Sequence, residues 1–245
     1  MKDSRPSHRV AATLASRFAG IRDATRALAA PLSPEDCALQ SMPDASPVKW
    51  HLAHTSWFFE TFLLVPSLAG YRPFDPAFKV LYNSYYNAVG DKHPRPERGL
   101  ISRPDLARVL EYRRHVDEAM TTLLAGDRGE LASLVELGLN HEQQHQELIL
   151  TDLKHLLSRN PLEPAYRAPW PLTPIRPCKA AWIGIEGGVR EIGHGGNGSA
   201  FDNESPRHRV WLDDFEIASH PVTHGDFIAF IEDGGYRRPE LWLSL

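Results

Sequence analysis

Two histidines, His141 and His145, lie four residues apart in a segment whose sequence is typical of a helix. Because four residues make about one helical turn, both imidazoles are expected on one helix face, where they can bind a metal ion together. Neutral imidazole is a ligand for zinc, iron, copper and nickel, so the spacing selects none of these metals. The segment differs from the zinc-protease pattern, because Glu142 is followed by two glutamines rather than by apolar residues.

A third ligand has to come from another element. At about 100° per residue, Gln144 shares the side of the helix that carries the two histidines, whereas Glu147 points elsewhere. The carboxylate of an iron site with two histidines and one carboxylate is therefore absent from this helix face. A second predicted helix offers His51 and His54, of which only one is expected to face the same centre. The sequence by itself favours neither, and a histidine pair without any metal is the alternative.

Four helices are expected to carry these residues, because apolar side chains recur at helical spacing in four segments. Ser46 is the expected N-cap of the second helix, with Pro47 in its first turn. Four long amphipathic helices indicate a bundle, in which metal sites are built from side chains on facing helices. The segments are residues 9–28, 46–65, 102–125 and 130–157.

The long connection between the second and third helices, residues 66–101, is rich in Pro, Gly, Tyr and Asn. Loops of this length are usually functional or disordered, so a role for this one is expected. It contains Arg95 and Arg98, which could bind a substrate carboxylate; two solvated arginines are the alternative.

The composition and the apolar pattern of the sequence change after residue 160. Six prolines between residues 161 and 177 exclude helix and indicate an extended linker. Beyond them, short alternating segments predict strands, and residues 221–231 predict a short helix. The predicted fold class is α+β, with a helical bundle over 1–160, a linker over 161–178 and a partial mixed domain over 179–245. The predicted strands are residues 182–185, 189–192 and 208–212.

Composition restricts the partners and the compartment. The net charge is -4 and no basic run occurs, which argues against nucleic acid or an anionic membrane as a partner. The apolar stretches are too short to span a bilayer and no signal-peptide core is present, so the cytoplasm is the expected compartment. Cys37 and Cys178 lack CxxC spacing and are expected to be reduced and structural.

Several motifs together resemble one family, the ergothioneine-synthesising sulfoxide synthases, also called hercynine oxygenases. Members of this family join a DinB-like four-helix bundle to a mixed domain that resembles the formylglycine-generating enzymes and the sulfatase-modifying factors, with a C-type-lectin-like fold. The motifs that carry the resemblance are residues 50–58, 82–87, 141–145, 201–204 and 206–208.

The resemblance implies an iron(II) site formed by His51, His141 and His145. It also implies that Gln144 approaches the imidazole of one substrate, and that Arg95 and Arg98 bind the carboxylates of the thiol substrate. The implied reaction uses dioxygen to join the imidazole of hercynine (N-alpha-trimethylhistidine) to the sulfur of cysteine or gamma-glutamylcysteine, and it oxidises that sulfur to a sulfoxide. The sequence does not choose between the two thiols.

Two departures from the family pattern affect these expectations. His224 stands in a Val-Thr-His-Gly segment where the family usually has Val-Thr-Asn-Gly. The family's catalytic tyrosine lies beyond Leu245, so no catalytic residue is assigned, and a truncated chain with impaired sulfoxide synthesis is expected. The alternatives are a DinB-type metal-dependent thiol transferase, which uses no oxygen, and a noncatalytic metal-binding remnant.

Overall fold

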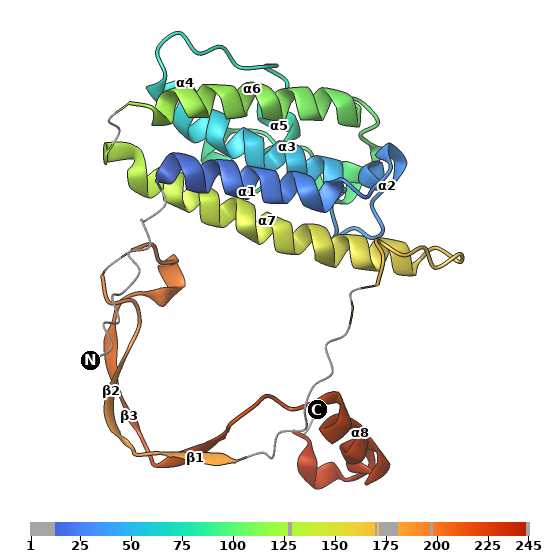
Figure 1. Cartoon of the computed structure of the whole chain (residues 1–245), viewed down its shortest axis with the longest axis vertical. Helices are drawn as coiled ribbons and strands as arrows, with labels where there is room; N and C mark the ends of the chain where they lie inside the picture. Colours follow the sequence, from blue (N-terminus) through green and yellow to red (C-terminus); the bar gives the residue numbers. More distant parts are fainter. Residues whose placement is uncertain (1–12, 127–128, 170, 172–180, 197, 244–245) are drawn as a thin grey trace, which may run out of the picture. The chain divides into compact units, whose positions relative to one another are not determined.

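The computed structural model describes residues 13–126, 129–169, 171, 181–196 and 198–243. The chain divides into two compact units, Met1–Trp170 and Pro171–Leu245, and the division falls within the predicted linker. The first unit is helical and the second contains small antiparallel sheets, so the predicted α+β class is confirmed (Figure 1). Residues 172–178 of the predicted linker, with Cys178, lie outside the described residues.

The long helices of the first unit, α1, α3, α6 and α7, run side by side (Figure 1). Helix α3 lies against both α6 and α7, and α1 lies against α7. Short helical segments fill the connections, including the long one between α3 and α6. The helices are α1 (Leu14–Ala29), α2 (Pro34–Ala38), α3 (Val48–Phe59), a π-helical turn (Glu60–Leu64), α4 (Val65–Ser67), α5 (Phe78–Leu81), 3-10 turns (Asn87–Val89, Arg95–Leu100 and Gly129–Leu131), α6 (Leu106–Leu124) and α7 (Ala132–Ser158).

Helix α3 is the centre of the bundle, because every one of its residues is buried. A helix that is enclosed on all sides can hold polar side chains only where partners satisfy them, so its two histidines must have defined contacts. The predicted N-cap at Ser46 is wrong by one residue. The carbonyl of Pro47 accepts the first helical N–H groups, whereas the Ser46 hydroxyl accepts a hydrogen bond from Arg98.

Helix α7 approaches α3 closely at Gly138. A Cβ atom there would lie 2.6 Å from Cε1 of Phe59 and 2.9 Å from Cε1 of Phe58, which is closer than van der Waals contact allows. Both rings are buried members of the packed core, where neighbouring side chains resist a shift. The absence of a side chain at Gly138 therefore sets the distance between the two helices that carry the histidines.

We expect Gly138→Ala to lower the free energy of unfolding by about 1–3 kcal/mol, because the two rings must shift. This loss comes in spite of the gain of about 1 kcal/mol that alanine brings to a helix interior. Gly20→Ala in α1 is the matched control, since no described atom lies within 4 Å of its Cβ position. Urea unfolding followed by circular dichroism measures both, and a control variant that loses as much stability as Gly138→Ala would contradict the packing argument.

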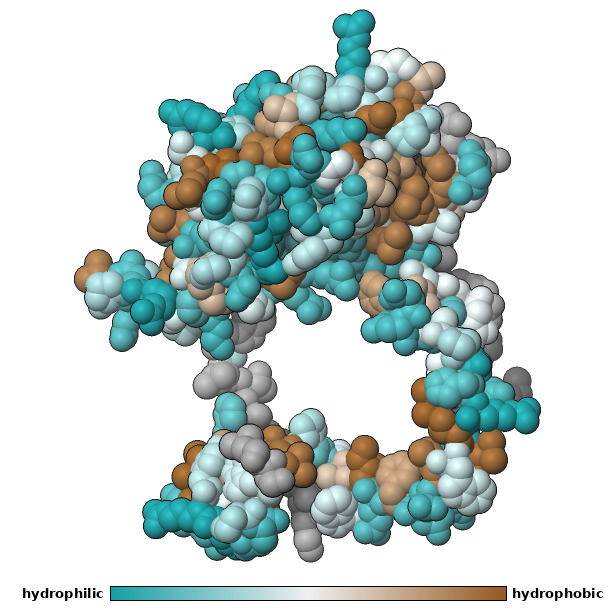
Figure 2. Space-filling model, turned by 180° about the vertical axis from the view of Figure 1, so that it is seen from behind, coloured by the Kyte–Doolittle hydropathy of each residue, from teal (hydrophilic) through white to brown (hydrophobic). Residues whose placement is uncertain are grey.

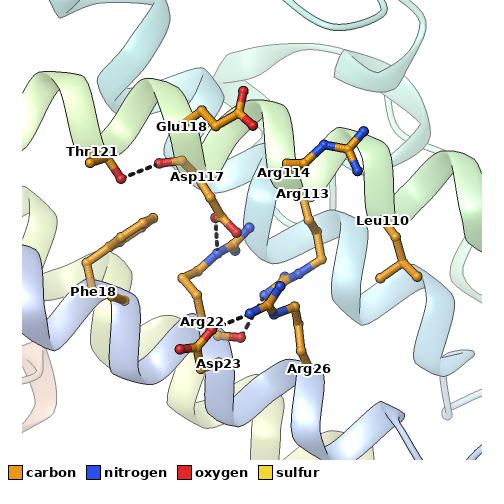
Figure 3. A pocket seen from close by; sticks show the side chains of 11 residues that line it. Phe18, Arg22, Asp23, Arg26, Leu110, Arg113, Arg114, Asp117, Glu118 and Thr121 are labelled. Atoms are coloured by element: carbon orange, nitrogen blue, oxygen red, sulfur yellow. Dashed lines mark hydrogen bonds and ion pairs between the residues drawn. The ribbon is translucent and has the colours of Figure 1, made fainter.

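A network of buried charges fixes the other face of α7. Glu142 is fully buried and accepts hydrogen bonds from Arg22 on α1 at 3.0 Å and from Arg113 on α6 at 2.9 Å. Thr25 donates a third bond to Glu142. Figure 3 shows Asp117 of α6, which pairs with Arg22 at 2.6 Å. Because Glu142 points at α1 and α6, the neighbouring histidines of α7 are turned towards α3.

The described residues of the second unit form two antiparallel ribbons and one α-helix, with short 3-10 turns. Strand β1 (Trp182–Ile185) pairs with β4 (Phe215–Ala218), and β2 (Gly188–Ile192) pairs with β3 (His208–Leu212). Helix α8 (His224–Glu232) follows, capped by the side chain of Thr223. The remaining elements are 3-10 turns at Asp202–Glu204, Gly235–Arg237 and Pro239–Leu241. The three predicted strands and the predicted helix are therefore present, and β4 was missed.

Large apolar side chains of this unit remain at the surface (Figure 2). Trp182 and Trp211 are 69% and 70% exposed, and the described part of the unit buries few side chains. Two-stranded ribbons of this kind have little stability of their own. His224, the departure from the family pattern, is the first residue of α8 and is exposed. None of the described helices has the length and apolar composition that a bilayer crossing requires.

Candidate metal centre

Three histidines from α3 and α7 converge in the first unit: His54, His141 and His145. One ring nitrogen of each lies within 4.8 Å of the others. The ring centroids are 5.1 Å apart for His54 and His141, and 4.7 Å apart for the other two pairs. Such a cluster of imidazole nitrogens is the donor set that binds zinc, iron, copper or nickel. The structure thus brings His141 and His145 together as predicted from their spacing.

The third member of the cluster is His54, where the resemblance had implied His51. Both ring nitrogens of His51 are already engaged: Nδ1 lies 2.8 Å from Nδ1 of His145, and Nε2 lies 3.1 Å from Oδ2 of Asp152. His51 and His54 therefore meet different residues of α7. His51 contacts Asp152, whereas His54 contacts His141. Of these two histidines, His54 is the one whose ring nitrogen groups with those of His141 and His145.

A backbone carbonyl orients His54. Its Nδ1–H donates a hydrogen bond to the carbonyl oxygen of Tyr82 at 2.6 Å, because a carbonyl can only accept. The lone pair of the neutral ring is then on Nε2, the nitrogen left for the cluster. The ring is stacked between Trp50 and Trp57, with centroid distances of 4.5 and 5.4 Å. Its position and its tautomer are both fixed before any ligand arrives.

Burial keeps the three rings neutral. It lowers the pKa of His54 and His145 well below the usual value, and the neighbouring histidines lower both further. Burial also lowers the pKa of His141 to about 4. Neutral rings offer lone pairs rather than charges near neutral pH. Nδ1 of His141 is buried and has no hydrogen-bond partner among the described residues. A cation bound at the cluster would supply a partner for the imidazole nitrogens.

The cluster opens onto a cavity of about 570 Å³, which also receives both predicted arginines. Arg98 is buried; its guanidinium carbon lies 3.4 Å from the ring centroid of Trp50, and it donates to the hydroxyls of Ser46 and Ser84. Burial, and then the charge of Arg95, lower the pKa of Arg98 to about 10, so it stays positive at neutral pH. It has no carboxylate partner among the described residues. An anionic group of a ligand would supply one.

Arg95 lies at the same cavity but is less buried. It donates to the hydroxyl of Tyr85 at 2.8 Å and to the backbone carbonyl of Asp44. Gln144 also lines the cavity and is exposed there, one residue before a histidine of the cluster. The structure therefore places all three predicted substrate-binding residues around one space.

Sequence reasoning missed three groups at this site. The Tyr82 carbonyl and the Trp50 ring have no signal beyond their presence in aromatic segments. Asp152 had a signal in the sequence, because it lies seven residues after His145, about two helical turns along the same face. A polar residue on the same helix face as a histidine pair can be found from the sequence.

Comparisons with known proteins agree with the two-unit organisation. Residues 17–149 match the sequence model of the DinB superfamily, and residues 174–244 match that of the sulfatase-modifying factor enzyme 1-like domain. A hercynine oxygenase from Mycolicibacterium thermoresistibile is 32% identical over 209 residues, which are 82% of this chain and 44% of that protein.

Two further relatives carry the same name. The hercynine oxygenase of Mycobacterium tuberculosis is 32% identical over 204 residues, covering 82% of this chain and 46% of that protein. That of Mycolicibacterium smegmatis is 30% identical over 240 residues, covering 94% of this chain and 52% of that protein. The chain thus spans about half the length of the curated relatives that it matches.

Proposed function

We propose, because this chain belongs to the DinB superfamily and to its hercynine-oxygenase-like members, that the cavity of the helical bundle is the iron(II) and thiol site of a sulfoxide synthase. The reaction would join the imidazole of hercynine to the sulfur of gamma-glutamylcysteine or cysteine, with dioxygen as co-substrate. The observation that carries the proposal is the convergence of three neutral imidazoles beside a buried arginine that lacks a carboxylate partner among the described residues.

The proposed iron ligands are His54, His141 and His145. Their donor set fits the metal, because the rings are neutral and a buried ring nitrogen, Nδ1 of His141, has no hydrogen-bond partner among the described residues. When bound, iron(II) held by three neutral ligands supplies positive charge and open coordination positions for a thiolate and dioxygen. This set replaces the one with His51 that the sequence resemblance implied.

The chain's own residues have the task of binding and orienting the substrates. Arg98 binds a carboxylate of the thiol substrate, and the hydroxyls of Ser46 and Ser84 together with the Trp50 ring keep its guanidinium in place. Arg95, at the same cavity, binds a second carboxylate or shares the first. Gln144 has two amide donors and one acceptor with which to contact the substrate imidazole.

We expect Arg98→Met to weaken binding of gamma-glutamylcysteine about 10- to 100-fold, the effect of losing charged hydrogen bonds worth about 1.5–3 kcal/mol. Iron affinity should change little, because Arg98 contacts none of the three histidines through a hydrogen bond. Calorimetric titration of the iron-loaded chain under nitrogen measures both quantities. Arg108→Met is the control, since Arg108 is exposed, stacks on Phe74 and pairs with Glu111. Equal effects of the two substitutions would contradict the proposed role.

The function is tested by adding iron(II) to the purified chain without oxygen, then both substrates, and finally oxygen. We expect one iron per chain, and the product that identifies this reaction, even when it forms slowly, has the mass of the sulfoxide. Failure to bind iron would refute the proposal. Iron binding without any product would favour the noncatalytic alternative, and thiol transfer without oxygen would favour the thiol transferase that shares this bundle.

A further inference from the structure

Three side chains form a hydrogen-bonded row beside the cluster: Asp152, His51 and His145. Oδ2 of Asp152 lies 3.1 Å from Nε2 of His51, and Nδ1 of His51 lies 2.8 Å from Nδ1 of His145. The backbone N–H of Ser46 donates to the same Oδ2 atom at 2.8 Å. His51 is 2% exposed and Asp152 is 8% exposed, so water has little access to the row.

The row fixes where the protons lie. Oδ2 of Asp152 is a carboxylate oxygen and can only accept, as it does from the N–H of Ser46, so in the contact with His51 the proton is on Nε2 of His51. A neutral His51 then has its lone pair on Nδ1, which can only accept. The single proton between the two Nδ1 atoms therefore belongs to His145. The lone pair of His145 is left on Nε2, the nitrogen available to the cluster.

The opposite arrangement is incompatible with a metal. If Nδ1 of His51 donated, His51 would be an imidazolium ion and the neutral His145 would carry its proton on Nε2. That proton would occupy the position of the metal, and a second positive charge would lie beside a divalent cation in a buried site. A metal at the cluster is thus compatible with only one of the two proton arrangements.

We propose that His51 and Asp152 are positioning residues that hold His145 in the tautomer with Nε2 free for the metal. The inference rests on the proposed metal site and assigns a role to the histidine that the sequence resemblance had placed among the ligands. His54 receives the same kind of support from the Tyr82 carbonyl, so two of the three rings have their tautomers set by groups behind them.

Two substitutions of His51 separate this role from simple packing. His51→Leu fills the space but removes the acceptor that faces His145. His51→Asn is smaller, yet it places an amide oxygen close to where Nδ1 of the imidazole lies. A packing role predicts that the larger leucine is tolerated better. A positioning role predicts that asparagine restores function, because it can still accept the proton of His145.

The first readout is the affinity for Co(II), which is measured from the visible absorption of the bound ion. We expect the unmodified chain to bind one Co(II), His51→Leu to bind it about 10- to 100-fold more weakly, and His51→Asn to recover most of that loss. His155→Ala is the control, because His155 is also on α7 and hydrogen-bonded, but to Ser41 and away from the cluster. Equal Co(II) affinity in all four proteins would overturn the inference.

The second readout needs no metal and keeps the two proposals apart. Nitrogen-15 NMR of histidine-labelled, metal-free protein reports which ring nitrogen carries the proton. We expect His145 to be protonated on Nδ1 in the unmodified chain and in His51→Asn, and to be a mixture of tautomers in His51→Leu. Protonation on Nε2 in the unmodified chain would overturn the inference. If that chain shows the expected tautomer but binds neither Co(II) nor iron(II), the proposed function fails while the positioning role stands.

Discussion

Replacing His54 by alanine is expected to reduce the affinity of the chain for iron(II) or Co(II) by more than the 10- to 100-fold typical of losing a supporting group. The substitution leaves only His141 and His145 in the cluster, and two imidazoles hold a divalent ion far more weakly than three. The measurement is an anaerobic titration of the metal into the purified variant, with the unmodified chain alongside.

The matched comparison is His51→Leu, because the two histidines lie three residues apart on the same buried helix. His54→Phe should behave like His54→Ala in metal binding. It keeps an aromatic ring between Trp50 and Trp57, so it separates the loss of a ligand from the loss of packing. If His51→Leu weakens the metal more than either substitution of His54, the ligand set implied by the sequence resemblance is right and the geometric one is not.

The long helices and the histidine pair could be predicted because each depends on local spacing. Over the described residues, the apolar period located the four helices to within a few residues, and the four-residue spacing placed His141 and His145 on one face. Residues 9–12 of the predicted first helix lie outside the described residues. The third ligand could not be chosen in this way. His51 and His54 differ by about 60° around their helix, and both contact His145. The choice depends on how α3 and α7 are offset along their axes, which no local pattern specifies.

The rest of the site depends on irregular backbone. The Tyr82 carbonyl is directed at His54 by the end of α5 and the turn after it, and a main-chain group leaves no trace in side-chain spacing. Strand β4 is a different case, since Phe215 and Ile217 alternate with polar or small residues and the pattern was present. That strand was overlooked, whereas the carbonyl was not predictable.

Replacing Glu142 by glutamine is expected to lower the free energy of unfolding by about 3–5 kcal/mol, the usual result of removing one member of a buried ion pair. Arg22 and Arg113 are each almost completely buried and both pair with this carboxylate. Its loss leaves the charge of Arg113 without a carboxylate partner in the core, whereas Arg22 keeps its pair with Asp117. Glu136→Gln on the same helix is the control. Its partner Arg17 is 37% exposed, and pairs of that kind contribute only about 0–1 kcal/mol. Urea unfolding at neutral pH measures both.

The unmodified chain and Glu142→Gln are also expected to differ in how their stability depends on pH. Burial opposes ionisation of Glu142, but the guanidinium groups of Arg22 and Arg113 outweigh it and lower its pKa from the ordinary 4.5 to about 2. A carboxyl group whose pKa is lower in the folded state contributes stability that is complete above the unfolded value and is lost as the pH falls towards the folded one. Glutamine does not titrate, so the difference in stability between the unmodified chain and Glu142→Gln should be constant above about pH 5 and should shrink between pH 4.5 and 2. A difference that stays unchanged through that range would mean that the destabilisation comes from altered packing of α7 and not from the loss of the carboxylate that faces the two arginines.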